Sequence, residues 1–258
     1  MRILALDTAT WICSVALVRD GDVRAERIER TVASHAGTLP RLVDEVLAEA
    51  GERPERGDAV AVAIGPGSFT GLRIGLSFAK GLAFASGLAI VGVPTLDALA
   101  LAALPWTGVL CAALDARKQE IYAALFTRDD GMCEDGTHDG GAIVRLGEPV
   151  AVRARALAEV LTPPCSVIGD AVEAYGGVFR EVLGAGVDLL ASDAHPPRAS
   201  ALARLAAARL ARDPRGDDLV TLAPGYIRPP EAELTQSAGA PSAPLLASSF
   251  VDKVRLLY

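Results

Sequence analysis

A repeated strand pattern is the feature that most constrains the fold of this 258-residue chain. The apolar run Leu4-Ala5-Leu6 ends in Asp7, and the run Ala112-Ala113-Leu114 ends in Asp115. A short polar turn follows each aspartate, and a second apolar strand comes next, at residues 12–18 and 121–126. Because the order of elements recurs, we expect a duplication in which two α/β units form the molecule.

The residues between these strands predict further helices and strands. Apolar side chains from Leu39 to Ala50 recur at helical spacing, with Pro40 near the start and Gly51 after the end. A strand at 59–64 leads through a glycine-rich turn into a helix at 71–86. The other expected elements are strands at 3–7, 23–28, 89–93, 166–168 and 187–190, and helices at 96–104, 157–161, 172–183 and 199–211.

The expected domains follow from this order and from a late shift in composition. An N-terminal lobe would span residues 1–105 and a C-terminal lobe residues 106–228, and the length suits two domains. Residues 229–258 are rich in Pro, Ala and Ser and show no periodicity up to residue 249, which predicts a tail.

Charge and cysteine usage exclude several classes of protein. The formal net charge is −7, so a role with RNA would need a partner to supply positive surface. No uncharged apolar run is long enough for a membrane span, and we expect no secretory signal before the first strand. The cysteines Cys13, Cys111, Cys133 and Cys165 are scattered, which is typical of reduced thiols and favours a cytoplasmic location.

The glycine turn Gly65-Pro66-Gly67-Ser68-Phe69-Thr70-Gly71 can be interpreted in two ways. A turn between a strand and a helix N-terminus can hold an anion with its backbone N–H groups. It can also be a compact connection between a strand and a helix, which is all that such a turn does in most proteins. The Gly-Lys-Ser/Thr ending of a P-loop is lacking, and the glycines do not have dinucleotide-fold spacing.

Few residues are candidates for chemistry. A nucleotide site would use Asp7, Thr8, Gly67 and Asp115, with the aspartates facing each other across a cleft; alternatively each aspartate caps its own turn. The three histidines, His35, His138 and His195, show no metal-ligand spacing, so we expect neither a metal site nor a catalytic residue.

The helix after the glycine turn is better suited to contact. Gly71, Gly75, Ala79 and Ala83 recur every four residues and would leave one helix face almost bare, with Leu72, Leu76 and Lys80 on the neighbouring row. The bare face could receive a helix of a partner, or the chain's own sheet could cover it.

Several segments together resemble one bacterial family, TsaB (YeaZ). The resemblance is dense up to about residue 125 and returns briefly before the tail. The matching segments are residues 1–10, 13–17, 65–75, 91–96, 114–117, 120–122 and 224–228.

The resemblance implies a duplicated ASKHA fold, actin-like and ribonuclease H-like, with two mixed-sheet lobes. TsaB proteins are non-catalytic partners of TsaD, which forms N6-threonylcarbamoyladenosine (t6A) in tRNA, and the small ATPase TsaE joins the assembly. This chain would therefore need no cofactor, with ATP and Mg²⁺ belonging to the partner complex. It would contact tRNA only through the complex.

The family's partner interface lies on the first two helices, and these helices can also pair two copies of the chain. Carried over to this sequence, the interface residues would be Leu39, Leu42, Val43, Val46, Gly71, Leu72, Arg73, Gly75, Leu76, Ala79 and Lys80. The alternative function is a weak Mg-dependent nucleotide phosphohydrolase or kinase-like ASKHA enzyme that uses Asp7 and Asp115.

Overall fold

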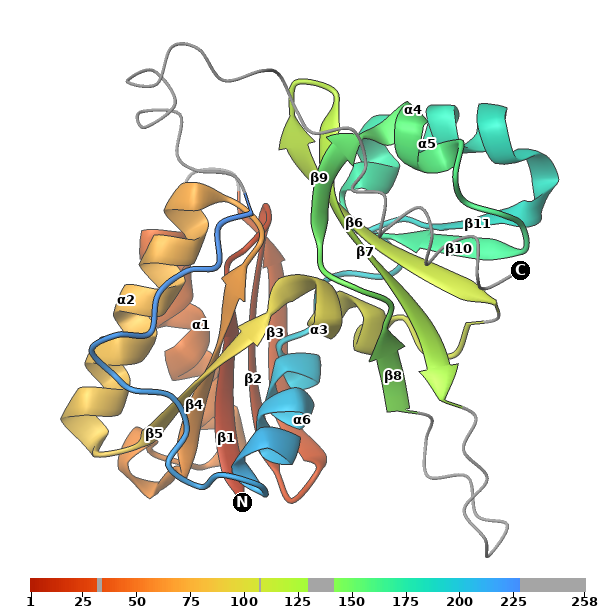
Figure 1. Ribbon diagram of the computed structural model, residues 1–258. Coiled ribbons are helices and arrows are strands. Elements are labelled where there is room, and N and C mark those ends of the chain that lie inside the picture. The colour runs from red at the N-terminus through yellow and green to blue at the C-terminus, as the bar shows by residue number, and fades with distance from the viewer. Residues whose placement is uncertain (32–33, 107, 130–141, 228–258) are drawn as a thin grey trace, which may run out of the picture. The chain divides into compact units, whose positions relative to one another are not determined.

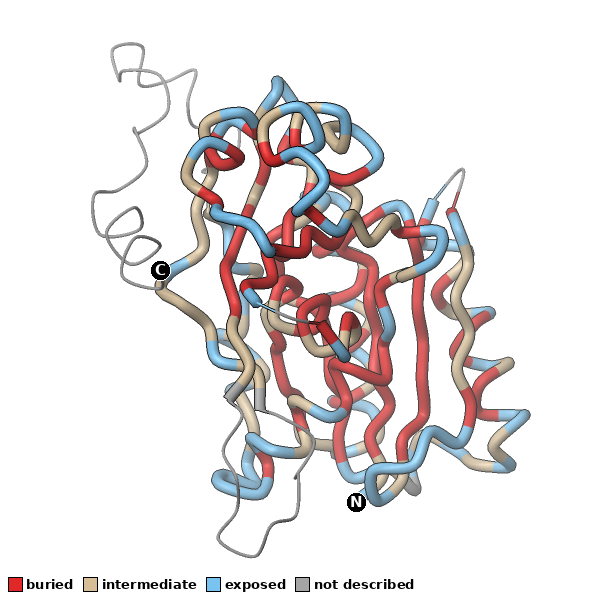
Figure 2. Tube along the Cα trace, turned by 90° about the vertical axis from the view of Figure 1, so that its right-hand side faces the viewer, coloured by how far each residue is buried: buried red, intermediate tan, exposed pale blue. Residues whose placement is uncertain are grey.

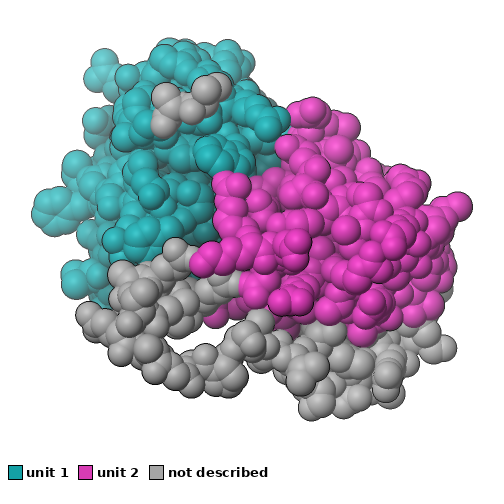
Figure 3. Space-filling model, turned by 90° about the horizontal axis from the view of Figure 1, so that it is seen from above, with its two compact units in different colours: residues 1–98, 196–226 teal, residues 99–195, 227–258 magenta. Residues whose placement is uncertain are grey.

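The computed structural model describes residues 1–31, 34–106, 108–129 and 142–227. Cys133, His138, Arg228 and the expected tail at 229–258 lie outside the described residues. The chain divides into two compact units: unit 1 consists of Met1–Ala98 and Pro196–Tyr226, and unit 2 is built on Leu99–His195 (Figure 3).

Unit 1 contains a five-stranded mixed sheet in the order β3-β2-β1-β4-β5. Its strands are β1 (Arg2–Asp7), β2 (Ile12–Arg19), β3 (Asp22–Arg30), β4 (Ala59–Gly65) and β5 (Ala89–Pro94). The pairs β1–β2 and β2–β3 are antiparallel, whereas β4 runs parallel to both β1 and β5. The strands β1, β2 and β4 are buried over almost their whole length (Figure 2), because helices cover the sheet.

Two helices, α1 (His35–Ala50) and α2 (Phe69–Ser86), pack on one face of this sheet, and α6 (Ala199–Leu210) packs on the other (Figure 1). The start of α1 is capped by Ser34, whose Oγ accepts the N–H of Ala36 at 3.1 Å. Its end is set by Gly51, which has the left-handed φ of 65° that glycine adopts without strain. A short 3₁₀ helix, η1 (Pro54–Arg56), follows.

Unit 2 contains a sheet in the order β11-β10-β6-β7-β8, with β9 also paired to β7. Two helices accompany it, α4 (Ala154–Ala158) and α5 (Ala171–Leu183), with the 3₁₀ helix η2 (Gly184–Gly186) after α5. The strands are β6 (Val109–Arg117), β7 (Glu120–Asp129), β8 (Ala142–Arg145), β9 (Val150–Arg153), β10 (Cys165–Ile168) and β11 (Val187–Leu190).

The two sheets have the same topology, which confirms the predicted duplication. In unit 1 the first strand, β1, lies between the antiparallel β2 and the parallel β4; in unit 2, β6 lies between the antiparallel β7 and the parallel β10. The next strands outward are also equivalent, β5 in unit 1 and β11 in unit 2. The fold is therefore the expected α/β, duplicated ASKHA fold with two mixed sheets.

The unit boundaries differ from the expected lobes at 1–105 and 106–228. The division falls inside α3 (Thr95–Ala102), and Pro196–Tyr226 belongs to unit 1. Helix α6 explains the difference, because it packs on strands β1 and β2 of unit 1. Its residues Leu202, Ala203 and Ala206 are buried. Apolar burial thus returns this late segment to the first sheet.

Two details of unit 2 differ from what the sequence predicts. Helix α4 occupies Ala154–Ala158 rather than 157–161, and the sequence reading missed the strands β8 and β9. Each of these strands has only four residues.

Candidate functional site

The glycine turn between β4 and α2 is built by contacts within unit 1. Helix α2 begins at Phe69, two residues before the expected start, and is capped by Ser68. The Oγ of Ser68 accepts the N–H of Gly71 at 3.2 Å. The N–H of Gly65 donates to the hydroxyl of Thr95 at 3.1 Å. Two backbone donors of the turn therefore already have acceptors in the chain.

The loop after β1 packs directly on this turn. The N–H of Ser68 donates to the carbonyl of Ala9 at 2.7 Å, and the hydroxyl of Thr8 donates to the carbonyl of Gly71 at 2.8 Å. A Cβ atom on Gly67 would lie 2.4 Å from the Ala9 carbonyl oxygen. The glycines are thus required for the close approach of two backbones, which is what the simple-connection interpretation expects. A nucleotide role for Thr8 and Gly67 stays a prediction.

Asp7 is buried at the end of β1, with 1% of its surface exposed. Its Oδ1 accepts the N–H of Ala9 at 2.9 Å, which closes a turn two residues long. Burial raises the pKa of this carboxyl to about 6, against the opposing effect of the Ala9 hydrogen bond. The neighbouring loop is also held by His35, whose ring Nε2 lies 2.8 Å from the carbonyl oxygen of Thr10.

Asp115 is the equivalent aspartate of unit 2, and it has the same local role. Its Oδ1 accepts the N–H of Arg117 at 2.8 Å and the hydroxyl of Tyr175 at 3.0 Å. Asp170, which the sequence reading missed, accepts the N–H of Asp115 at 2.8 Å, and burial raises its pKa to about 6. The signal that could have found it is the apolar strand that precedes it, as before the two predicted aspartates, although here Gly169 stands between the strand and the aspartate.

The bare stripe on α2 faces inward, and most of the residues predicted to contact a partner are buried within unit 1. A Cβ atom on Gly71 would lie 2.1 Å from the Thr8 carbonyl oxygen, and one on Gly75 would lie 2.2 Å from the Thr8 hydroxyl. A substitution at Gly75 therefore tests folding rather than partner binding. The predicted contact residues that are buried in unit 1 are Leu39, Leu42, Val43, Val46, Gly71, Leu72, Gly75, Leu76 and Ala79.

The opposite face of α2 is exposed and combines an open glycine with large apolar side chains. Gly81 lies on it, and a Cβ atom there would meet no other atom within 4 Å. On α1, Gly37 is equally open. Ile74 and Phe78 are only partly buried at the edge of the core of unit 1, and Phe84 is 79% exposed. We call the exposed residues of α1 and α2 with these partly buried side chains the outer helix face.

The last described segment of unit 1, residues 217–226, runs along β5 and α2 (Figure 1), and we call it the strap. Asp217 forms a bridge to Ile90 on β5, and its carboxylate accepts the N–H of Gly92 at 2.7 Å. Lys80, one of the predicted partner residues, donates to the carbonyl of Val220 at 3.0 Å. The exposed Arg73, the other remaining one, contacts the strap at Tyr226.

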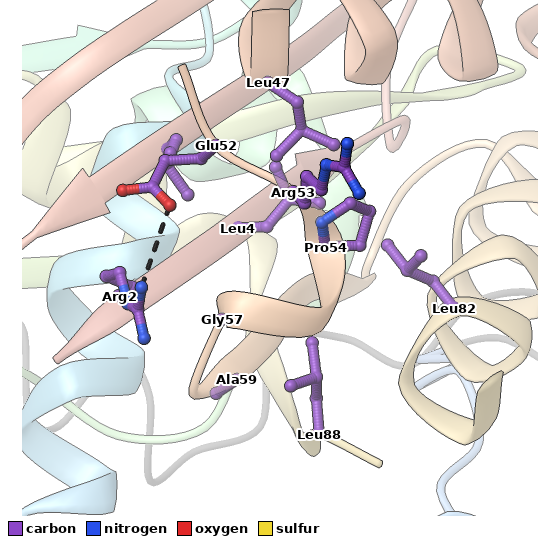
Figure 4. A pocket seen from close by; sticks show the side chains of 11 residues that line it. Arg2, Leu4, Leu47, Glu52, Arg53, Pro54, Gly57, Ala59, Leu82 and Leu88 are labelled. Carbon is purple, nitrogen blue, oxygen red and sulfur yellow. Dashed lines mark ion pairs between the residues drawn. The ribbon is translucent and has the colours of Figure 1, made fainter. Parts of the chain in front are cut away.

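A shallow apolar pocket lies at the other end of the sheet of unit 1 (Figure 4), where β1 and β4 begin. Leu4, Leu47 and Leu88 line it, and Glu52 forms ion pairs with Arg2 and Arg19 beside it. None of the residues predicted for a nucleotide lines this pocket.

Two structural features are lacking among the described residues. No group of three or more His, Cys, Asp or Glu side chains there could hold a metal ion. Within the same residues, no helix is both long enough and apolar enough to cross a membrane.

The chain is similar to known proteins of the TsaD and TsaB families. A family model described as TsaD, tRNA N6-adenosine threonylcarbamoyltransferase, matches residues 28–236. The tRNA threonylcarbamoyladenosine biosynthesis protein TsaB of Bacillus subtilis (strain 168) is 30% identical over 233 residues, which are 90% of this chain and 96% of that protein.

Two further relatives belong to the same TsaB (YeaZ) family. TsaB of Escherichia coli (strain K12) is 43% identical over 132 residues, covering 50% of this chain and only 57% of that protein. The solved structure of YeaZ from Pseudomonas aeruginosa superposes with a TM-score of 0.70 at 30% identity, covering 87% of this chain and 99% of the other.

Proposed function

The chain belongs to the TsaB family, and on that premise we propose that it serves the formation of t6A in tRNA as a non-catalytic subunit that binds TsaD. In this proposal the chain supports the transferase and performs no chemistry itself. TsaE joins the assembly, ATP and Mg²⁺ belong to the partners, and tRNA is bound through the complex.

The observation that carries this proposal is the outer helix face. Glycine in a helix costs about 0.5–1 kcal/mol relative to alanine, and Gly81 has open space where a Cβ would lie. The fold of unit 1 itself gives no steric reason for a glycine there, unlike at Gly71 or Gly75. A helix of another protein that approaches α2 closely supplies the reason. Gly177 in α5 is equally open, but among its described residues α5 has no exposed large apolar side chain comparable to Phe84 of α2, so the two features together single out α2.

The apolar side chains of the outer helix face support the same conclusion. Ile74 and Phe78 are one helical turn apart and remain partly exposed, and Phe84 is almost fully exposed further along the same helix. A partner helix that packs on α1 and α2 would bury these side chains. The same face can pair two copies of the chain when TsaD is absent.

The decisive experiment places a large side chain at Gly81. Gly81→Arg should fold, because the site is open, and should weaken binding to purified TsaD by about 100-fold or more, because the arginine occupies the space of the partner helix. The matched control is Gly177→Arg in α5, where a helical glycine is equally open. It should bind TsaD as the unchanged chain does.

The readouts are the dissociation constant from calorimetry and the rate of t6A formation by TsaD with each variant. If Gly81→Arg binds TsaD and supports t6A formation as well as Gly177→Arg does, the outer helix face is not the interface. If the unchanged chain neither binds TsaD nor affects its activity, the proposed function is wrong.

A further inference from the structure

Arg73 is fixed in position by two aromatic side chains at the start of α2. Its guanidinium carbon lies 3.9 Å from the centroid of the Phe69 ring. Its Nε donates to the hydroxyl of Tyr226 at 3.2 Å. The rings of Phe69 and Tyr226 are themselves in contact, with centroids 5.3 Å apart and planes tilted by 30°. Stacking and the hydrogen bond together restrict a side chain that would otherwise be highly flexible.

The two terminal nitrogens of Arg73 have no carboxylate partner in the described part of the chain, unlike those of several other arginines in unit 1. Arg41 forms ion pairs with Glu29 and Glu45, and Arg209 binds Asp217 at 2.7 Å. Among the described residues, no carboxylate lies within ion-pair distance of Arg73. Its planar fork is therefore held in place with two nitrogens available, which is the geometry that binds a carboxylate through two parallel hydrogen bonds.

The strap is fixed to unit 1 next to Tyr226, so the Tyr226 hydroxyl is held within hydrogen-bond distance of Arg73. The N–H of Gly225 donates to the carbonyl of Ile64 at 2.7 Å, immediately before the glycine turn. Tyr226 remains 36% exposed and Phe69 40% exposed, although each is a large aromatic side chain. The cluster of Phe69, Arg73 and Tyr226 therefore presents a charged group on an aromatic base at the surface of unit 1.

We propose that Arg73 binds a carboxylate of the partner protein, with Phe69 and Tyr226 as positioning residues. The proposal rests on the proposed function, because Arg73, Ser77 and Gly81 are exposed at four-residue spacing on the outer helix face. It adds that the partner must supply an Asp or Glu side chain, and that this side chain would bind near the start of α2.

Charge favours a protein carboxylate over an RNA phosphate, although both fit a guanidinium. The chain carries a formal charge of −7. On α1 beside α2, Glu45 and Glu49 already pair with Arg41 and Arg27, while Asp44 adds a further negative charge. A polyanion would be repelled by the net negative charge of the chain, whereas a single carboxylate in an interface needs only one matched cation.

The experiment compares three substitutions in the full chain by their dissociation constants for TsaD at low and moderate salt. Arg73→Gln should weaken binding by about 10- to 100-fold, with the larger loss at low salt. Arg73→Lys keeps the charge but loses the planar fork, and should still lose about 5-fold or more. Tyr226→Phe removes only the hydrogen bond to Nε, and should weaken binding by about 3-fold.

Arg212→Gln is the matched control, since it removes the same charge from an exposed residue after α6, on the other face of the sheet. It should leave the dissociation constant unchanged. Thermal unfolding of each variant confirms that the fold is kept.

Two outcomes would overturn the proposal while the proposed function stands. In the first, the unchanged chain binds TsaD and Gly81→Arg does not, but Arg73→Gln binds like Arg212→Gln. In the second, the chain without partners binds tRNA in a salt-sensitive manner and Arg73→Gln abolishes it, so that the ligand is a phosphate. If the unchanged chain does not bind TsaD at all, the proposed function fails first.

Discussion

The two units share a sheet topology but differ in the helices that connect equivalent strands. Between β3 and β4 of unit 1 lies α1 with 16 residues, whereas α4, between β9 and β10 of unit 2, has 5. In the next connection α2 has 18 residues and α5 has 13. The sheets therefore preserve the duplication, and the long helix pair that could bind another protein is present in unit 1.

The strand ends are more alike than the helices. Asp7 accepts the N–H of Ala9, and Asp115 accepts the N–H of Arg117, so each aspartate closes a turn to the residue two positions later. A glycine after β4 also lies close to the loop that follows β1, and a glycine after β10 lies close to β6. These shared contacts are structural, and they define where substitutions should have equal effects in both units.

The largest effects should come from glycines at these close approaches. In unit 1, Gly71→Ala would place a Cβ 2.1 Å from the Thr8 carbonyl oxygen; in unit 2, Gly169→Ala would place one 2.1 Å from the Ala113 carbonyl oxygen. The clashing atoms belong to the backbone of the first strand or its loop, which cannot shift without disturbing the sheet. Each variant should therefore lose about 3 kcal/mol of unfolding free energy in urea titrations.

The control for these variants is Gly177→Ala in α5, where the added Cβ meets nothing within 4 Å. It should gain about 0.5–1 kcal/mol, since alanine favours the helix. Equal stability of Gly71→Ala and Gly177→Ala would contradict the packing of the loop 8–10 against α2.

The buried aspartates should give both units a similar dependence on pH. Burial raises the pKa of Asp7 and Asp170 from 3.8 to about 6, so each native carboxyl keeps its proton at a pH where the unfolded chain releases it. Stability from these groups is complete below pH 3.8 and is lost as the pH rises through 6, by up to about 3 kcal/mol for each group.

Asp7→Asn and Asp170→Asn remove this ionisation with little change of shape. Relative to the unchanged chain, each variant should gain unfolding free energy between pH 4 and pH 7. A difference that stays constant over this range would show that the carboxyl is not buried in its protonated form.

A smaller effect should separate the units at Tyr175, whose hydroxyl donates to Asp115 in unit 2. Tyr175→Phe should cost about 1 kcal/mol, the value of one hydrogen bond, because the ring keeps its packing. The double variant with Asp115→Asn should be less destabilised than the sum of the single variants. Strict additivity would mean that the two side chains do not interact in solution.

The repeated strands and the first two helices could be predicted because their signals are local. The spacing of Leu39, Leu42 and Val46 identifies α1 and also its buried face. The direction of the stripe on α2 could not be predicted in this way. Spacing shows that one face is bare, but Thr8, which covers it, is 63 residues away from Gly71 in the sequence.

The cluster around Arg73 shows the same limit more strongly. Tyr226 lies 153 residues after Arg73, and only the return of the chain to unit 1 brings them together. The family resemblance points to Arg73 itself but not to the contact with its aromatic neighbours. A contact of this kind depends on the complete topology, which periodicity does not report.

The division of unit 1 into two separate segments has a consequence for synthesis on the ribosome. Met1–Ala98 emerges first, but α6 and the strap emerge only after the whole of Leu99–His195. Unit 2 can therefore complete its sheet while the first sheet still has one face and the edge at β5 uncovered. The segment Pro196–Tyr226, made after the sheet of unit 2, thus finishes the unit that was started first.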